Sequence, residues 1–409
     1  MLQNVLESVG LDSQTCAGLL GFNPAVFAEW SAGQRPIPES VLPLLSAVFS
    51  VPPSILRAPA KAARNLREED ITPAIWYKFR GPELVNADRE CVVLIRQLGH
   101  YLNELEAVTR NRSVQWKTLF ESIRNATDLQ AAPREQGRSA ARMFREATSL
   151  SHGATGSGEV LRGMLRSLGI LVFETPLKES RLEGCSFYVG TQSATRPCIF
   201  ANTHHVTWFR RNVVLMHEVG HSIFESALVG ASLDFLNRED VAEPLELRAQ
   251  AFAQECLVPK SVLVHVAQSH GIKWANLSAR SLARIVADTH VEQRTVVAAA
   301  AEAGLIASEA TEELKRIDIS SDLHELSKHA LSTEEYLELI GAKNADEWIG
   351  KRTTTLTPRP LRLPVGYVTT VVDAYRDCQI SLGKGAEYLM IDDSEFAGRF
   401  GEIYQGVEE

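Results

Sequence analysis

The pattern of apolar and polar positions predicts that most of this 409-residue chain is helical. Residues 212–225 and 246–258 carry apolar residues at helical spacing, and the second run ends before Pro259, so we predict two helices there. The chain should therefore have an α+β fold: a mainly helical multidomain protein with a small three-stranded sheet beside the helix at 212–225. The three predicted strands are 170–174, 185–189 and 198–201.

The beginning of the chain contains two short helical patterns separated by a turn. Residues 13–21 form the first pattern, Asn23 is a favourable N-cap residue, and residues 24–33 form a second helix that ends at Gly33. This order resembles the helix-turn-helix of lambda-repressor/Cro-like domains. Residues 1–60 contain only two basic residues against four acidic ones. Because phosphate contacts supply most non-specific affinity for DNA, we expect a degenerate unit that serves packing or protein contact.

Composition divides the chain into four segments. Residues 1–60 are the helix-turn-helix-like domain, and residues 61–135 are a helical, arginine-rich connector. Residues 136–310 hold the candidate chemistry described below. Residues 311–409 are acidic, with 19 Asp or Glu against 11 Lys or Arg, and are a candidate sensor or docking domain that includes two short helices at 367–386.

Several features predict a cytoplasmic protein that does not contact a membrane. No run approaches the roughly 18 uncharged apolar residues that a membrane span requires. The first residues lack the basic and apolar regions of a secretory signal. The six cysteines show no C-x-x-C pairing, which is typical of reduced intracellular thiols.

The candidate chemistry lies in five consecutive residues, His217-Glu218-Val219-Gly220-His221. On a helix the two histidines are one turn apart and project from one face, close enough to bind one metal ion. Glu218 would lie beside a bound water molecule and act as a general base, the arrangement typical of zinc hydrolases. Gly220 costs about 1 kcal/mol of helix stability relative to Ala, so we expect either that a neighbour packs closely there or that a side chain would obstruct the site.

A helix with merely hydrogen-bonded core histidines is the alternative interpretation, but two buried His and one buried Glu would then need several polar partners. A catalytic zinc ion usually takes three protein ligands. Glu246 is the candidate for the third, because small residues share its stripe on the helix at 246–258 and would let the two helices approach closely. The rivals are loop residues, and spacing alone leaves the choice open: Glu239, Asp240 and Glu243.

The sequence M-H-E-V-G-H followed by E-L-R-A-Q-A-F-A-Q-E-C-L-V-P resembles the ImmA/IrrE family of bacterial metallopeptidases, whose pattern is roughly H-E-L-G-H and then E-x-x-A-x-x-F-A-x-x-L-L-x-P. The resemblance extends over about residues 135–310. It implies that His217, His221 and Glu246 bind Zn2+ and that Glu218 is the catalytic base.

Members of this family cut, or assist in cutting, a partner transcriptional repressor. The resemblance therefore implies a zinc endopeptidase whose substrate is a helix-turn-helix repressor protein, in a stress or phage-defence response. One departure is Arg248, where the family often has a second acidic residue. The alternative is a non-catalytic helix-turn-helix transcriptional regulator or antitoxin-like binding protein with a structural zinc. Glu218 favours the enzyme, because a structural zinc site needs no base.

Two further groups of side chains remain candidates for function. Peptide hydrolysis needs a donor for the developing oxyanion, and the sequence does not choose among the available residues: His204, His205, Tyr188, Arg210 and Arg211. Aromatic and basic connector residues would bind single-stranded DNA as a signal, although core aromatics with solvated basic residues are the more ordinary interpretation: Trp76, Tyr77, Lys78, Phe79, Arg80, Tyr101, Arg110, Arg112, Trp116 and Lys117.

Overall fold

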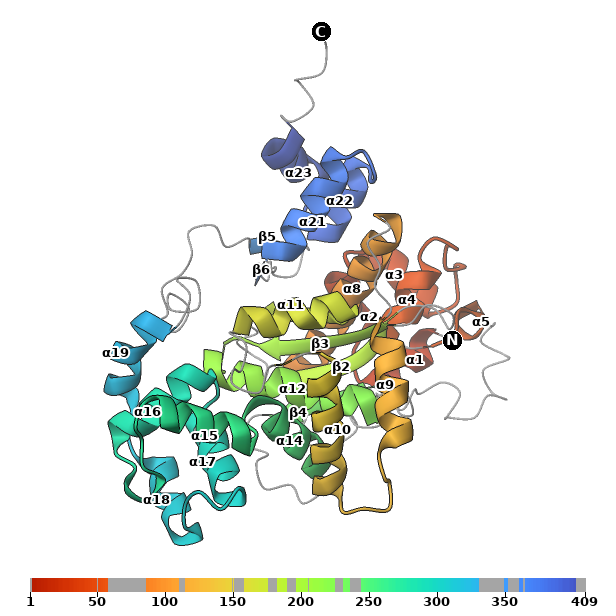
Figure 1. Ribbon diagram of the computed structural model, residues 1–409. Coiled ribbons are helices and arrows are strands. Elements are labelled where there is room, and N and C mark those ends of the chain that lie inside the picture. Colours follow the sequence, from red (N-terminus) through yellow and green to blue (C-terminus); the bar gives the residue numbers. More distant parts are fainter. Residues whose placement is uncertain are drawn as a thin grey trace.

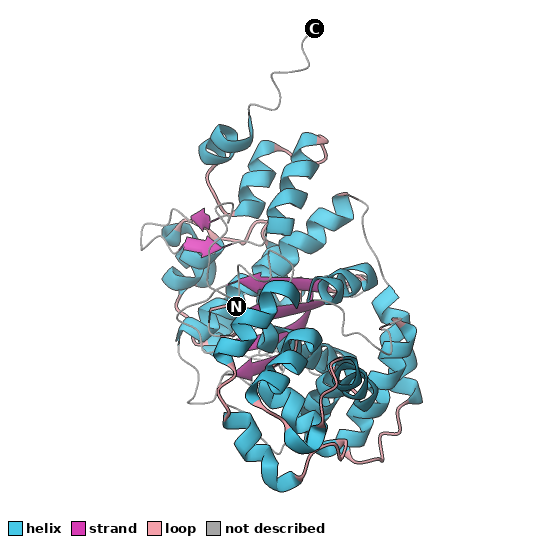
Figure 2. Cartoon of the chain, turned by 60° about the vertical axis from the view of Figure 1, so that its left-hand side comes forward, coloured by secondary structure: helices cyan, strands magenta, loops and turns pink. Residues whose placement is uncertain are grey.

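A computed structural model of the chain describes most of its residues, and the structural statements below concern these alone. They are residues 2–49, 51–57, 86–109, 115–148, 150, 158–175, 182–189, 196–204, 206–224, 231–235, 244–330, 349–351, 360–362 and 365–401. The described part is mainly helical and contains one four-stranded sheet and one two-stranded sheet. Figure 2 shows the larger sheet inside the molecule with helices around it.

Five short helices form the beginning of the chain (Figure 1). Their bounds are α1 Leu2–Val9, α2 Ser13–Leu20, α3 Pro24–Ser31, α4 Leu42–Phe49 and α5 Pro53–Arg57. The two helices predicted on either side of a turn are α2 and α3. Gly21 ends α2 in the left-handed region with φ 77°, and the Asn23 side chain caps α3 by accepting hydrogen bonds from the N–H groups of Ala25 and Val26. The binding role of this unit stays a prediction.

Four longer helices follow: α8 Asn86–Val108, α9 Gln115–Ala126, α10 Pro133–Ala147 and α11 Gly158–Leu168. Two aromatic candidates for stacking on single-stranded DNA lie here, and both are buried: Tyr101 in α8 is 2% exposed and Trp116 in α9 is 7% exposed. Both rings therefore belong to the core and cannot stack on a base, whereas Lys117 is exposed. The other candidates lie outside the described residues: Trp76, Tyr77, Lys78, Phe79, Arg80, Arg110 and Arg112.

The larger sheet contains β1 Leu171–Thr175, β2 Leu182–Val189, β3 Arg196–Asn202 and β4 Ala231–Phe235, in the order β1-β3-β2-β4. The first three are the predicted strands, and β4 adds a fourth at the edge. β1 runs parallel to β3, whereas β2 is antiparallel to both β3 and β4. The short run Ala-Ser-Leu-Asp-Phe of β4 lacks the β-branched residues that mark a strand in sequence, which is why only pairing with β2 reveals it.

Alternation along the strands divides the sheet between two cores. Cys185 and Phe187 of β2 belong to a first core that also contains buried residues of α1–α5, α8 and the C-terminal helices. Ile199 and Ala201 of β3 face the opposite way, into a second core with buried residues of α9, α10 and α11 and of the helices that follow the sheet. The N-terminal helices and the C-terminal helices therefore pack around the same face of the sheet.

The helix with the candidate motif is α12 Trp208–Phe224, and the second predicted helix is α14 Pro244–Leu257, so both predictions are confirmed. Pro259 follows α14 and is the N-cap residue of the next helix, α15. The remaining elements of this region are α15 Lys260–Ser269, η3 Trp274–Asn276, α16 Ala279–Thr289, α17 Gln293–Glu302, η4 Ser308–Ala310, α18 Thr311–Arg316 and α19 Ser320–Ala330.

The C-terminal region has a strand pair, β5 Ile349–Lys351 and β6 Pro360–Arg362, and three helices, α21 Val365–Arg376, α22 Leu382–Leu389 and α23 Asp393–Phe400. The sequence predicted only two helices there. The Tyr388 ring of α22 lies 5.4 Å from the Tyr101 ring of α8, and Lys384 forms an ion pair with Glu104 at 3.3 Å. These contacts attach the C-terminal helices to α8.

The unit α22–α23 repeats the geometry of α2–α3. Each unit has an eight-residue helix, a left-handed residue, a buried or half-buried apolar residue, an N-cap residue and a second eight-residue helix. Met390, with φ 56°, takes the place of Gly21. The same positions of the first helix are buried in both units: Cys16, Ala17, Leu19 and Leu20 in α2, and Gly385, Ala386, Tyr388 and Leu389 in α22. The described residues thus contain two helix pairs with matching turns and buried positions, and both pairs contribute to the first core.

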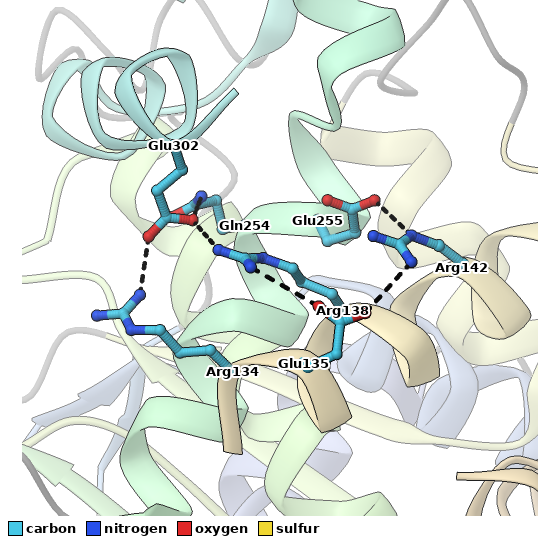
Figure 3. Close-up of polar contacts among 7 residues, drawn as sticks. All are labelled: Arg134, Glu135, Arg138, Arg142, Gln254, Glu255 and Glu302. Carbon is cyan, nitrogen blue, oxygen red and sulfur yellow. Dashed lines mark hydrogen bonds and ion pairs between the residues drawn. The ribbon is translucent and has the colours of Figure 1, made fainter. Parts of the chain in front are cut away.

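A polar network joins α10 to α14 and α17 (Figure 3). Glu302 of α17 accepts hydrogen bonds from Arg134 at 2.9 Å, Arg138 at 2.6 Å and Gln254 at 2.8 Å. The two arginines lie one turn apart on α10, so one carboxylate offsets their mutual repulsion. The network therefore helps to hold α14 beside α10.

Replacing Glu302 by glutamine is expected to lower the free energy of unfolding by about 1 kcal/mol at low salt, because Arg134 and Arg138 lose the charge that they share. Salt screens such partly exposed pairs, so the difference should shrink at high ionic strength. Chemical denaturation at two salt concentrations measures both effects. Glu255→Gln is the control, since Glu255 pairs with Arg142 and not with Glu302. A Glu302→Gln effect independent of salt would contradict this account.

No helix in the described part of the chain has the length and apolarity needed to cross a bilayer. The five cysteines with described side chains are free thiols.

Candidate metal centre

Two histidines of α12 and one glutamate of α14 converge on one point. The Nε2 atoms of His217 and His221 are 3.0 Å apart. Oε2 of Glu246 lies 3.2 Å from Nε2 of His217 and 3.5 Å from Nε2 of His221. Among the described residues, these three side chains form a group that could hold a metal ion. The tertiary packing thus brings Glu246, one of the candidates that spacing alone left open, to the two histidines.

Close packing of α14 on α12 places Glu246 opposite the two histidines. A Cβ atom on Gly220 would lie 3.2 Å from Cα of Ala249 and 3.3 Å from Cδ1 of Phe252. The expectation that something packs closely against Gly220 is therefore confirmed. Ala249 and Ala253 are buried, which agrees with the predicted stripe of small residues on α14. A glycine facing small residues lets the two backbones approach, and this brings a short Glu side chain within reach of both imidazoles.

On its other side α14 packs against α10. A Cβ atom on Gly137 would lie 2.2 Å from the carbonyl oxygen of Arg248 and 2.9 Å from the amide nitrogen of Phe252. Arg145 of α10 also donates a hydrogen bond to the carbonyl oxygen of Cys256. The position of α14, and with it that of Glu246, is therefore set by contacts on both sides.

Arg248, which departs from the family pattern, points toward α10. Its Nη1 donates to Oε1 of Gln136 at 2.8 Å, and its guanidinium lies 4.5 Å from the centre of the Phe224 ring. These contacts occupy the guanidinium with packing between α10, α12 and α14. The rival third ligands lie outside the described residues: Glu239, Asp240 and Glu243.

Glu246 is held in the carboxylate form that a metal ligand requires. Burial favours its neutral form, but hydrogen bonds from His217 and His221 and the charge of these rings outweigh burial and hold the pKa of Glu246 well below its usual range. The carboxyl group is therefore an anion at neutral pH. It is 23% exposed, whereas the side chain of His221 is 2% exposed, so the group lies at the boundary of the core.

Glu218 lies on the side of α12 that faces β2. It is fully buried, with 0% exposure. A Cβ atom on Gly184 of β2 would lie 3.5 Å from Cγ of Glu218 and 2.4 Å from Cγ1 of Val214, so only glycine permits this approach of strand and helix. The sequence analysis did not identify Gly184. A glycine inside a predicted strand is the signal that would have found it, because it commonly marks a close approach.

The oxyanion candidates make contacts of their own within the fold. Tyr188 donates its hydroxyl hydrogen to the carbonyl oxygen of Ser222 at 2.9 Å, and burial raises the pKa of this phenol. Arg210 contacts Glu183 and Glu292, each at 2.7 Å, and Arg211 lies 3.6 Å from Glu174. His204 is exposed, and His205 lies outside the described residues. These contacts do not bring a donor to the three converging ligand atoms.

Comparison with protein families gives one match. Residues 165–283 match the model of Peptidase_M78, the IrrE N-terminal-like domain. This part of the chain is therefore similar to the ImmA/IrrE family of peptidases. The match includes β1–β4, α12 and α14, and thus His217, Glu218, His221 and Glu246. Neither α2–α3 nor α22–α23 falls within it. Searches of curated proteins and of solved structures gave no match. The chain therefore carries a peptidase-family domain with long additions on both sides.

Proposed function

We propose that the chain is a zinc-dependent endopeptidase that cleaves a partner helix-turn-helix repressor in a stress or phage-defence response. The observation that carries the proposal is the convergence of His217, His221 and Glu246 beside Glu218, inside an ImmA/IrrE-family domain. Two imidazole nitrogens and one carboxylate oxygen leave a fourth position open, which is typical of catalytic zinc sites and not of structural ones.

The distances in this group fit a zinc ion. Ligand atoms that surround one zinc ion tetrahedrally at about 2.1 Å lie about 3.4 Å from one another. The three separations here are 3.0, 3.2 and 3.5 Å. Nitrogen and oxygen donors of this kind suit Zn2+, and the anionic Glu246 would offset part of the ion's charge.

The residues then divide the chemistry between them. His217, His221 and Glu246 would hold the ion, which supplies Lewis acidity that activates water and polarises the scissile carbonyl. Glu218 would accept the proton of the attacking water at a carboxylate oxygen and later give it to the leaving nitrogen. β4 ends the sheet beside β2, and an extended segment of the substrate would add to an edge strand of this kind through main-chain hydrogen bonds.

The additions outside the matched domain support selective docking of one partner. A small hydrolytic site discriminates poorly among peptide segments, so the choice of substrate needs contacts elsewhere. The helices of residues 1–60 and of α21–α23 share a core with one face of the sheet. We propose that these units supply the docking surface. Single-stranded DNA as a signal stays a prediction.

The first test is metal content. The purified chain is expected to hold about one zinc ion, and His221→Ala is expected to lose it, because two remaining ligands bind zinc weakly. Elemental mass spectrometry measures zinc per chain. His265→Ala is the control, since His265 is an exposed residue of α15 and should leave the zinc in place. Full retention of zinc by His221→Ala would refute the ligand assignment.

The second part of the test is cleavage. A helix-turn-helix protein encoded beside this gene is incubated with the zinc-loaded chain, and the products are identified by mass spectrometry. We expect discrete fragments that disappear when a chelator removes the zinc. A zinc-loaded chain that binds this protein but leaves it intact would favour the non-catalytic regulator.

A further inference from the structure

Three fully buried polar side chains lie on β2 and α12, which pack against each other, and the mechanism above uses only one of them. Ser186 of β2 and Glu218 and Ser222 of α12 are each 0% exposed. The surrounding second core consists of aliphatic and aromatic side chains. Burying a hydroxyl or carboxylate lowers the stability of the fold unless the group is hydrogen-bonded, so the two serines need an explanation.

The packing of α12 against β2 indicates the direction of the Ser186 side chain. Gly184, Ser186 and Tyr188 alternate along β2 and face the same side. At one end of this row, Gly184 approaches Cγ of Glu218, as the 3.5 Å separation from its added Cβ shows. At the other end, Tyr188 reaches the carbonyl oxygen of Ser222 at 2.9 Å.

Glu218 and Ser222 are one turn apart and share a face of α12. Ser186, between Gly184 and Tyr188, therefore faces the stretch of α12 between Glu218 and Ser222. Its partner in β3 is Ile199, a residue of the second core, which agrees with this direction.

Both hydroxyls are unsatisfied. Among the described residues, the Oγ atoms of Ser186 and Ser222 have no hydrogen-bond partner. A buried hydroxyl of this kind costs about 1–3 kcal/mol relative to a paired one. Alanine at either position would avoid the cost with almost the same volume. Residues that lower stability in this way commonly serve activity.

We propose that Ser186 and Ser222 are positioning residues for Glu218. Their hydroxyls donate hydrogen bonds to the Glu218 carboxylate and hold it in one rotamer, with an oxygen directed to the side of His217 and His221. Catalytic hydrogen bonds often form only when a ligand is bound. The inference rests on the proposed function, because it assigns two supports to the proposed base.

The test measures the affinity of the zinc-loaded full-length chain for acetohydroxamate by calorimetry, because a base must take up the proton that this probe releases. Ser186→Ala and Ser222→Ala should each bind the probe about tenfold more weakly than the wild type, the effect of one lost hydrogen bond. Both variants should retain zinc. Both should also melt at the wild-type temperature or above it, since each loses an unsatisfied buried hydroxyl.

Ser327→Ala is the matched control. Ser327 is also 0% exposed, and its hydroxyl has no partner among the described residues, but it lies in α19, which packs on α16. This variant should gain the same stability and bind the probe like the wild type.

Two outcomes separate the two proposals. If Glu218→Gln binds the probe as tightly as the wild type, the proposed base is wrong. If Glu218→Gln binds weakly while both serine variants match the wild type, the positioning role fails alone. A marked loss of stability in Ser186→Ala and Ser222→Ala would also overturn this role, because the hydroxyls would then serve the fold.

Discussion

Replacing Glu218 by glutamine is expected to abolish cleavage of the partner while the chain keeps its zinc and its fold. The two side chains have nearly the same shape, but an amide cannot accept the proton of the attacking water. Loss of a general base typically costs 100-fold to 10,000-fold in rate, so we expect a reduction of about 100-fold or more. Turnover of the partner protein is measured for both chains at equal zinc content.

Two controls accompany this experiment. Melting temperature and metal content should match those of the wild type, because His217, His221 and Glu246 are unchanged. Glu302→Gln replaces a carboxylate in the network of Figure 3, on α17, and should cleave the partner at the normal rate. Near-normal cleavage by Glu218→Gln would show that another residue is the base.

Replacing Gly137 by alanine is expected to destabilise the fold by about 3 kcal/mol, among the largest effects of a single added methyl group. The new Cβ atom would lie 2.2 Å from a backbone oxygen and 2.9 Å from a backbone nitrogen of α14. Neither atom belongs to a flexible side chain, so α14 must move away from α10. Because Glu246 is part of α14, this displacement should also weaken zinc binding.

Gly163→Ala provides a matched control for this prediction. Gly163 lies in α11, and a Cβ atom there would have no neighbour within 4 Å. Alanine has the higher helix propensity, so this variant should be stabilised by up to about 1 kcal/mol. Chemical denaturation and zinc titration of both variants measure the two effects. Equal stability of Gly137→Ala and the wild type would contradict the packing described for α10 and α14.

The candidate chemistry was largely predictable because its elements are local. The (i, i+4) spacing of His217 and His221 brings both rings to one face of any helix, and the apolar pattern of 212–225 specifies a helix. Gly220 also predicted a close neighbour, and the contact with Ala249 and Phe252 confirms it. These inferences need only a few consecutive residues.

The third metal ligand could not be identified from such local patterns. Glu246 and three loop residues were all compatible with the spacing, since a chain reversal between two helices leaves many side chains within reach. Contacts of Gly137 and Gly220 with α14 place Glu246 beside the histidines. These contacts join residues far apart in the chain, and no local pattern reports them.

The likeness between the helix pairs α22–α23 and α2–α3 shows the same limit on a larger scale. α22–α23 has the helix lengths, turn and buried positions of α2–α3, but Met390 stands where Gly21 does and most other residues differ. The two helix pairs share a backbone geometry and a pattern of buried positions, and many different side chains are compatible with both. The sequence predicted two helices near 367–386 and no likeness to the beginning of the chain.

By itself, then, the sequence determined what depends on neighbours along the chain: the α12 and α14 helices, three strands, two histidines one turn apart, and the excess of acidic over basic residues in residues 1–60. The tertiary structure decided what depends on contacts between distant segments. It brought Glu246 to the histidines, added β4 to the sheet, placed Gly184 of β2 beside Glu218, and joined both ends of the chain in one core. The physical reason is that periodicity fixes the direction of a side chain within its own element, whereas its neighbours are selected by packing among all elements at once.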